Sequence, residues 1–202
     1  GGGATEDTCE GRVIINEVAW AGTAADSRDE WIELRNLGTI PVDLTGWTLR
    51  WRRKHPTTEE EYRWKVVDLS GILLPASTSA CELADNDYTP SVEFIKRDTD
   101  DLSWWVLGKH EEKDGSYYII ERRHDETISN KKADLLYDTT EPHEMDLTDL
   151  GDVIQLRNDR DEIVDTANAS NPERDGWPAG SAATFAAMER TNPLAPDTWE
   201  NW

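Results

Sequence analysis

Hydrophobic and polar positions alternate along much of this chain, in short runs separated by residues typical of turns. The runs are rich in β-branched and aromatic residues, which favour strands. Helical spacing is nearly absent, and SAATFAAMER (181–190) is the only stretch compatible with a helical turn. So many short strands in one chain predict an all-β domain, either a sandwich or a barrel. The strands are expected at 13–20, 30–36, 46–51, 62–67, 116–122, 152–158 and 162–168.

One hairpin can be predicted in register, between residues 46–54 and 59–67 with HPTT (55–58) as its loop. That register sets Trp51 opposite Tyr62 and the basic run RWRRK (50–54) opposite the acidic run EEE (59–61). We therefore interpret the basic run as self-neutralised rather than as an anion or nucleic-acid patch. One face of the hairpin then carries only apolar and aromatic side chains: Trp47, Leu49, Trp51, Tyr62, Trp64 and Val66.

A second hairpin is predicted within DVIQLRNDRDEIVDT (152–166), with NDRD as its turn. Setting Arg157 opposite Glu162 also sets Leu156 opposite Ile163. The acidic turn lacks the alternating oxygen ligands, the central Gly and the terminal Glu of an EF-hand. We therefore interpret it as a turn and not as a calcium loop.

The charge balance narrows the classes of partner. The chain has 42 acidic and 21 basic residues, a formal net charge of -21. Such a field repels nucleic acid and anionic lipid, so neither is expected as a general partner. No segment is long and apolar enough to predict a membrane-spanning helix.

Residues that could carry catalysis do not form a recognisable motif. No GxSxG elbow is present, and paired carboxylates are too numerous to single out one pair. Asn168-Ala169-Ser170 is a formal glycosylation sequon. The four histidines share no metal-ligand spacing, and we expect them at the surface: His55, His110, His124 and His143.

A series of segments, taken in order, resembles the lamin tail domain family, in the versions found in prokaryotic surface and secreted proteins. The resemblance implies an immunoglobulin-like β-sandwich with no catalytic activity of its own. It also implies that its recurrent positions are folding determinants: Glu17, Glu30, Trp31, Gly46, Trp47, Glu189 and Arg190. The segments are INEVAWAG (15–22), DEWIELRN (29–36), VDLTGWTLR (42–50), YYIIERRHDETIS (117–129), GDVIQLRNDRDEIVDTANA (151–169), GWPAG (176–180) and FAAMERTNP (185–193).

The resemblance also suggests how the chain is divided. Residues 1–12, small, polar and glycine-rich, are expected to be a flexible leader, and 13–202 the sandwich domain. Family members usually run directly from GILLPA-like residues into YYIIER, whereas here residues 77–114 intervene. This inserted segment carries ten acidic and four basic residues. Because loops grafted onto rigid sandwiches often carry the specific function, a distinctive site is expected here first.

The inserted segment contains the candidate ligand-binding and metal-binding residues. Adjacent Trp104 and Trp105 point to opposite faces if they lie on a strand, so at most one covers the core and the other could stack on a sugar or an aromatic ring. The simpler interpretation is an added hairpin whose aromatic side chains cap an end of the sandwich. Asp98, Asp100 and Asp101 could supply oxygen ligands to calcium, although their spacing is not diagnostic.

The chain has two cysteines, Cys9 and Cys81, which match no zinc or redox motif. One interpretation is a disulfide that joins the leader to the body, which would imply an oxidising compartment. The other interpretation is two unrelated buried thiols.

Taken together, these features predict a non-enzymatic extracellular or cell-surface module that acts as a scaffold for binding a protein or a cell-surface glycan. No cofactor is expected, with calcium as the alternative. A carbohydrate-binding module that uses the aromatic residues of the insertion is the second hypothesis. An acid- or metal-dependent hydrolase is the third.

Overall fold

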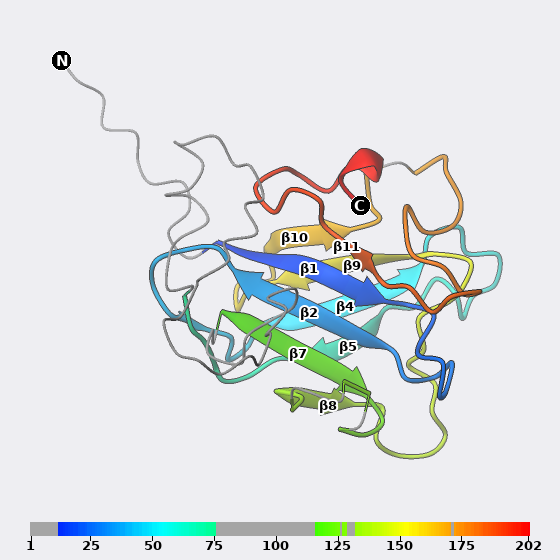
Figure 1. The fold of residues 1–202 in the computed structure, drawn as a ribbon, viewed down its shortest axis with the longest axis horizontal. Helices are drawn as coiled ribbons and strands as arrows, with labels where there is room; N and C mark the ends of the chain where they lie inside the picture. The colour runs from blue at the N-terminus through cyan, green and yellow to red at the C-terminus, as the bar shows by residue number, and fades with distance from the viewer. Residues whose placement is uncertain (1–11, 76–115, 126, 129–131, 171) are drawn as a thin grey trace, which may run out of the picture.

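The computed structural model describes residues 12–75, 116–125, 127–128, 132–170 and 172–202, which form an immunoglobulin-like β-sandwich (Figure 1). The predicted all-β fold is confirmed. A five-stranded sheet has the order β11-β1-β2-β7-β8, and a four-stranded sheet has the order β10-β9-β4-β5. The elements are β1 (Val13–Ala19), β2 (Trp31–Asn36), β3 (Val42–Asp43), β4 (Thr48–Arg53), β5 (Lys65–Asp68), β6 (Ile72–Leu73), β7 (Tyr117–Arg122), β8 (Leu135–Tyr137), β9 (Asp152–Arg157), β10 (Ile163–Ala167), β11 (Met188–Glu189) and the 3-10 helix η1 (Trp199–Asn201).

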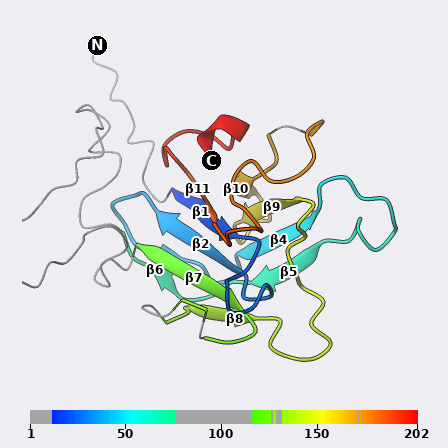
Figure 2. The same ribbon diagram turned by 45° about the vertical axis from the view of Figure 1, so that its right-hand side comes forward.

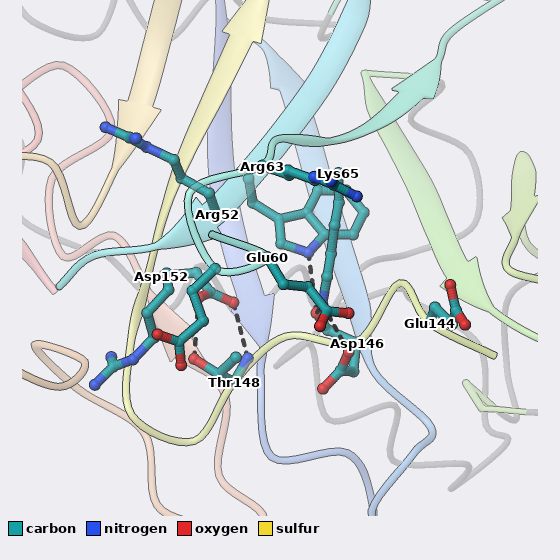
Figure 3. Close-up of a pocket in the computed structure, with 11 residues that line it drawn as sticks. Arg52, Glu60, Arg63, Lys65, Glu144, Asp146, Thr148 and Asp152 are labelled. Carbon is teal, nitrogen blue, oxygen red and sulfur yellow. Dashed lines mark hydrogen bonds and ion pairs between the residues drawn. The ribbon is translucent and has the colours of Figure 1, made fainter. Parts of the chain in front are cut away.

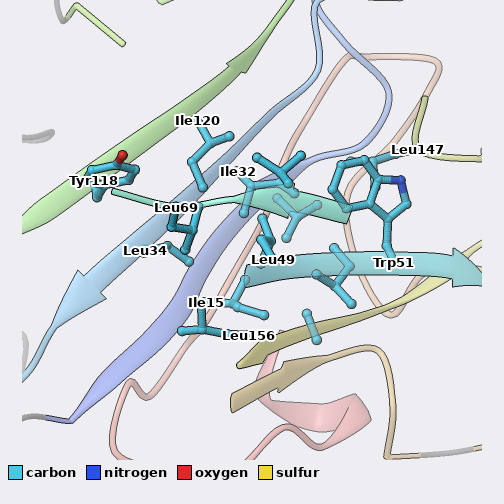
Figure 4. Close-up of a cluster of buried hydrophobic side chains, with 14 of the residues drawn as sticks. Ile15, Ile32, Leu34, Leu49, Trp51, Leu69, Tyr118, Ile120, Leu147 and Leu156 are labelled. Atoms are coloured by element: carbon cyan, nitrogen blue, oxygen red, sulfur yellow. The ribbon is translucent and has the colours of Figure 1, made fainter. Parts of the chain in front are cut away.

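The core lies between the two sheets and is built by the alternation seen in the sequence (Figure 4). Because successive side chains of a strand point to opposite faces, every second residue of β4 and β9 is buried. Trp51 is the largest of the fully buried side chains, and it makes an edge contact with Tyr137, with ring centroids 5.4 Å apart. Each such buried side chain stabilises the fold by about 1.5–3 kcal/mol. The central members are Ile15, Ile32, Leu34, Leu49, Ile120, Ile154 and Leu156.

The predicted register of the first hairpin was wrong by three residues. β4 pairs with β5 so that Leu49 lies opposite Val67 and Trp51 opposite Lys65. Residues 59–64 form a turn instead of a strand, because the Glu61 carboxylate accepts backbone hydrogen bonds from Thr57 and Thr58 at 2.6 and 3.1 Å. In consequence, Tyr62 and Val66, expected in the core, are 54% and 45% exposed.

Among the residues that the structure describes, the basic run 50–54 forms two ion pairs, and both differ from the predicted ones. Arg50 forms an ion pair with Asp161, and Arg53 forms one with Asp175 at 3.3 Å. The first of these partners lies in the β9–β10 turn, because the other neighbour of β4 in the sheet is β9. The acidic run 59–61 therefore does not face the basic run, and its Glu61 carboxylate binds Thr57 and Thr58 instead.

The second hairpin is confirmed, but its register was wrong. Ile163 lies opposite Arg157, and after a β-bulge Asp165 lies opposite Leu156. Asp161 adopts a positive φ of 61°, which lengthens the turn by one residue relative to the prediction. The bulge brings the Asp165 carboxylate against β1, where it accepts a hydrogen bond from the backbone N–H of Ile15 at 2.8 Å.

The helical turn expected within 181–190 was also wrong. Residues 182–185 form a turn closed by a bridge between Ser181 and Ala186, with Phe185 at φ 55°. The chain then enters β11, which pairs with β1 at the edge of the larger sheet. In the described part of the chain, η1 is the only helical element.

Candidate functional site

A cavity of about 330 Å³ opens at one end of the four-stranded sheet (Figure 3). Its walls are the end of β4, the turn at 59–64 with the start of β5, and residues 144–152, which lead into β9. Figure 2 shows the β4–β5 connection and the chain leading into β9 projecting on the same side of the sandwich. We call this cavity the charged pocket, because nine of the eleven residues that line it are ionisable.

Lys65 lies at the centre of the charged pocket. Its Nζ donates to Asp146 twice, to the carboxylate oxygen Oδ1 at 2.6 Å and to the backbone oxygen at 2.7 Å. The same backbone oxygen accepts a hydrogen bond from Nε1 of Trp51 at 3.1 Å. A core residue of β4 and a charged residue of β5 thus fix one residue of the 144–152 segment.

Two buried carboxylates accept hydrogen bonds from the backbone of the 144–152 segment. Glu30, immediately before β2, accepts a hydrogen bond from the backbone N–H of Leu147 at 2.8 Å. Asp152, the first residue of β9, accepts from the backbone N–H of Thr148 at 2.8 Å and from its hydroxyl at 3.0 Å. Burial raises the pKa of Glu30 to about 8 and that of Asp152 to about 6. The backbone of residues 146–148, which we call the floor of the pocket, is therefore fixed at consecutive residues.

Arg122 pairs with the buried Glu30 beneath the pocket. Its Nη1 lies 3.2 Å from Oε1 of Glu30, and its Nε lies 2.8 Å from Oδ2 of Asp138. All three side chains are at most 5% exposed. These contacts join the residue before β2 to the end of β7 and to the residue after β8.

The basic side chains of the lining are largely occupied, whereas two carboxylates are not. Arg53 donates to the backbone oxygens of Leu150 and Gly151, and the guanidinium of Arg52 lies over the Trp64 ring at 4.9 Å. Within the described residues, the carboxylates of Glu60 and Glu144 have no hydrogen bond or ion pair. The arrangement supports recognition of a charged group, with a fixed floor and free carboxylates at the rim.

The residues that sequence reasoning proposed as a site lie outside the described residues. This applies to Trp104 and Trp105, to Asp98, Asp100 and Asp101, and to both Cys9 and Cys81. The inserted segment 77–114 as a whole and all but one residue of the leader lie there as well. Within the described residues, no group of three or more His, Cys, Asp and Glu side chains could hold a metal ion.

The formal sequon at Asn168 is not an accessible glycosylation site in the folded protein. Asn168 is 2% exposed, and its Nδ2 donates to the backbone oxygens of Asp152 and Gly176 at 3.0 and 2.9 Å. The amide nitrogen to which a glycan would be attached is therefore already used in the structure. Its Oδ1 accepts a hydrogen bond from Nζ of Lys54 at 2.9 Å.

Arg190, a recurrent position in the sequence resemblance, performs a structural role. Its side chain is fully buried, and it pairs with Asp165 at 2.7 Å. It also donates to the backbone oxygens of Ile15 and Ala195 at 2.8 and 3.0 Å. This one side chain joins β1, β10 and the C-terminal segment.

Sequence reasoning missed the charged pocket. The prediction that the runs RWRRK and EEE face each other leaves no unpaired charge at this end of the hairpin. The acidic segment EMDLTD (144–149) carries no motif that marks it as part of a site. The clue in the sequence was a second acidic segment, immediately before a strand, that has no basic run next to it.

Comparison with known proteins gives one family. The sequence model described as Lamin Tail Domain matches residues 7–170 of the chain. No curated protein matches the chain. In the described part of the chain there is no helix with the length and apolar character needed to span a membrane. The matched range contains every residue of the charged pocket, while β11 and η1 follow it.

Proposed function

Because this chain belongs to the lamin tail domain family of immunoglobulin-like, non-catalytic interaction modules, we propose that it is an extracellular or cell-surface module that binds a partner through its charged pocket. The observation that carries the proposal is the contrast between the floor and the rim of this pocket. The backbone of residues 146–148 is fixed by Lys65, Glu30 and Asp152. In the part of the chain that the structure describes, the rim carboxylates of Glu60 and Glu144, in contrast, have no hydrogen bond or ion pair.

A rigid site with free polar groups is suited to binding, because little order has to be gained when the partner arrives. The net charge of -21 supports a partner that is not a nucleic acid. We place the module outside the cell, of the type found in prokaryotic surface and secreted proteins, on the strength of its sequence segments. The leader at 1–12 and the insertion at 77–114 are part of this proposal as appendages of one domain.

The test measures binding of the labelled full chain to intact cells of the organism that encodes it. We expect saturable binding that unlabelled folded chain displaces and heat-unfolded chain does not. Absence of saturable binding would count against the proposal. Turnover of a phosphoester or glycoside panel, lost in Asp152→Asn, would overturn it in favour of an enzyme.

The alternative is a carbohydrate-binding module that uses Trp104 or Trp105. It is supported by the combination of aromatic and acidic residues in the insertion. A glycan array separates the two hypotheses. Selective glycan binding that is abolished by Trp105→Ala, with the melting temperature unchanged, would favour the alternative. A calcium site at Asp98, Asp100 and Asp101 would raise the melting temperature in millimolar calcium, since an ion that binds only the folded state stabilises it.

A further inference from the structure

We propose that the charged pocket accepts a lysine or arginine side chain of a protein partner. The inference deepens the proposed function, on which it rests, by naming the chemical group that the pocket recognises. It depends on the volume of the cavity, on the charges that remain unpaired around it, and on the way in which it already holds an ammonium group.

The size of the cavity suits a side chain and not a large ligand. Sites for small molecules usually span about 300–1,000 Å³, so a cavity of about 330 Å³ lies at the lower limit of this range. Its position between two protruding segments also suits a partner that inserts one side chain while its backbone rests on the rim.

The unpaired charge of the pocket favours a cation. Asp152 is bound by Thr148, and Glu61 by Thr57 and Thr58, so these carboxylates serve the fold. Glu60 and Glu144 remain, and they come from opposite walls of the pocket (Figure 3). Arg52 and Arg63 oppose a cation, because neither guanidinium has an ion pair in the described part of the chain. Four carboxylates of the lining also have no ion pair there, those of Glu60, Glu61, Glu144 and Asp152, so the local balance remains negative. The net charge of -21 adds to the attraction at long range.

Lys65 shows how such a group is held. Its ammonium lies inside the pocket and is bound by two oxygens of Asp146, at 2.6 and 2.7 Å. The side chain of Asp146 is nevertheless 49% exposed, so a second cation can approach it from outside. Lys65 therefore occupies part of the site that a partner would use, and it competes with that partner.

The proposal therefore predicts that two kinds of substitution change the affinity for a cationic side chain in opposite directions. Replacing the free carboxylates in Glu60→Gln/Glu144→Gln should weaken binding of a cationic side chain by about three- to tenfold, since partly exposed ion pairs are individually weak. Lys65→Met should strengthen it by a similar factor, because the substitution removes the competing ammonium and leaves Asp146 unpaired.

The experiment is a nuclear magnetic resonance titration of the full chain with the blocked tripeptide acetyl-Gly-Arg-Gly-amide at physiological salt. We expect saturable shifts confined to the amides of residues 60–65 and 144–152, and none with the citrulline tripeptide, which has the same shape without the charge. The matched controls are Glu162→Gln/Asp159→Asn in the β9–β10 turn and Lys132→Met. They change the net charge equally, and we expect unaltered affinity.

Three results would overturn the inference: equal shifts with the citrulline peptide, shifts spread evenly over the acidic surface, or the same loss of affinity in the control pair as in Glu60→Gln/Glu144→Gln. A melting temperature for each variant establishes that it is folded. If the cells still bind the chain while the tripeptide gives one of these results, the pocket inference fails and the proposed function stands.

Discussion

Glu30 and Asp152 accept hydrogen bonds from consecutive backbone amides of one segment, although Glu30 precedes a strand of the five-stranded sheet and Asp152 begins a strand of the four-stranded sheet. Glu30 binds the N–H of Leu147 and Asp152 binds the N–H of Thr148, each at 2.8 Å. Burial raises the pKa of both carboxyl groups, to about 8 and about 6. The floor of the charged pocket is thus bound by two carboxyl groups that change protonation near pH 8 and pH 6.

We predict that the free energy of unfolding falls as the pH rises from about 5 to about 9. A carboxyl group whose pKa is raised by folding binds its proton more tightly in the folded protein, so its contribution is complete at low pH and is lost as the pH rises through the folded pKa. For Glu30 the loss extends from its ordinary pKa of 4.5 to about 8. Urea unfolding at several pH values measures the slope.

The control for this prediction is Glu30→Gln, which keeps an oxygen acceptor for Leu147 but cannot ionise. General repulsion among the carboxylates acts equally in both proteins, so the difference between them isolates Glu30. We expect a flatter dependence between pH 6 and 9 in the variant. Identical slopes would show that Glu30 is not protonated preferentially in the folded state.

Arg190→Met is predicted to destabilise the protein by about 3–5 kcal/mol, because it leaves the largely buried Asp165 without its counter-charge. It also removes the donors to Ile15 and Ala195. Arg160→Met, at an exposed ion pair, should cost no more than about 1 kcal/mol. Denaturant unfolding compares the two, and a similar cost for both would contradict the structural role of Arg190.

Two glycines with the same φ allow the cost of a positive φ to be measured separately from the cost of a steric clash. Gly151 and Gly71 both have φ of 92°, but an added Cβ at Gly151 would collide with the backbone oxygen of Gly176, whereas at Gly71 it meets no described atom within 4 Å. Gly71→Ala should therefore cost only about 1–2 kcal/mol for the positive φ. Gly151→Ala should cost clearly more, since backbone must move. Equal losses in thermal unfolding would contradict the close approach of residues 151 and 176.

The protein is predicted to carry no glycan at Asn168 when it is secreted from a glycosylating host, because the amide nitrogen is buried and donates two hydrogen bonds. Ser170→Ala destroys the sequon without touching Asn168, and we expect both proteins to show the mass of the bare chain. A glycan-sized mass increase in the unmutated protein alone would refute the prediction. Asn168→Ala should cost about 2–3 kcal/mol by leaving buried carbonyl groups without donors.

The sequence predicted the strands well where β-branched and aromatic residues form a short run between turn residues, as in β1, β2, β7 and β9. It failed where side chains bind backbone locally. The Glu61 carboxylate accepts backbone hydrogen bonds from Thr57 and Thr58, so residues 59–64 form a turn. The positive φ of Asp161 adds one residue to the β9–β10 turn. The pocket could not be predicted, because it depends on contacts between residues far apart in the chain, such as Lys65 with Asp146 and Glu30 with Leu147.

The register of the first hairpin gives the sharpest comparison of pattern with structure. The pattern placed Val66 on the core face, whereas the structure leaves it 45% exposed and buries Val67 to 7% exposure. Val66→Ala and Val67→Ala remove the same atoms, so their effects differ only through the environment of each side chain. Val67→Ala should cost about 2 kcal/mol through lost burial and an incompletely filled cavity. Val66→Ala should stay within about 0.5 kcal/mol.

Urea unfolding of the two valine variants decides between the registers, because each register assigns the larger loss to a different residue. The result also bears on the pocket. If Val66 faced the core, Lys65 would point away from Asp146, and the floor that holds its ammonium would not exist. A larger loss for Val66→Ala than for Val67→Ala would therefore contradict both the observed pairing of β4 with β5 and the site built on it.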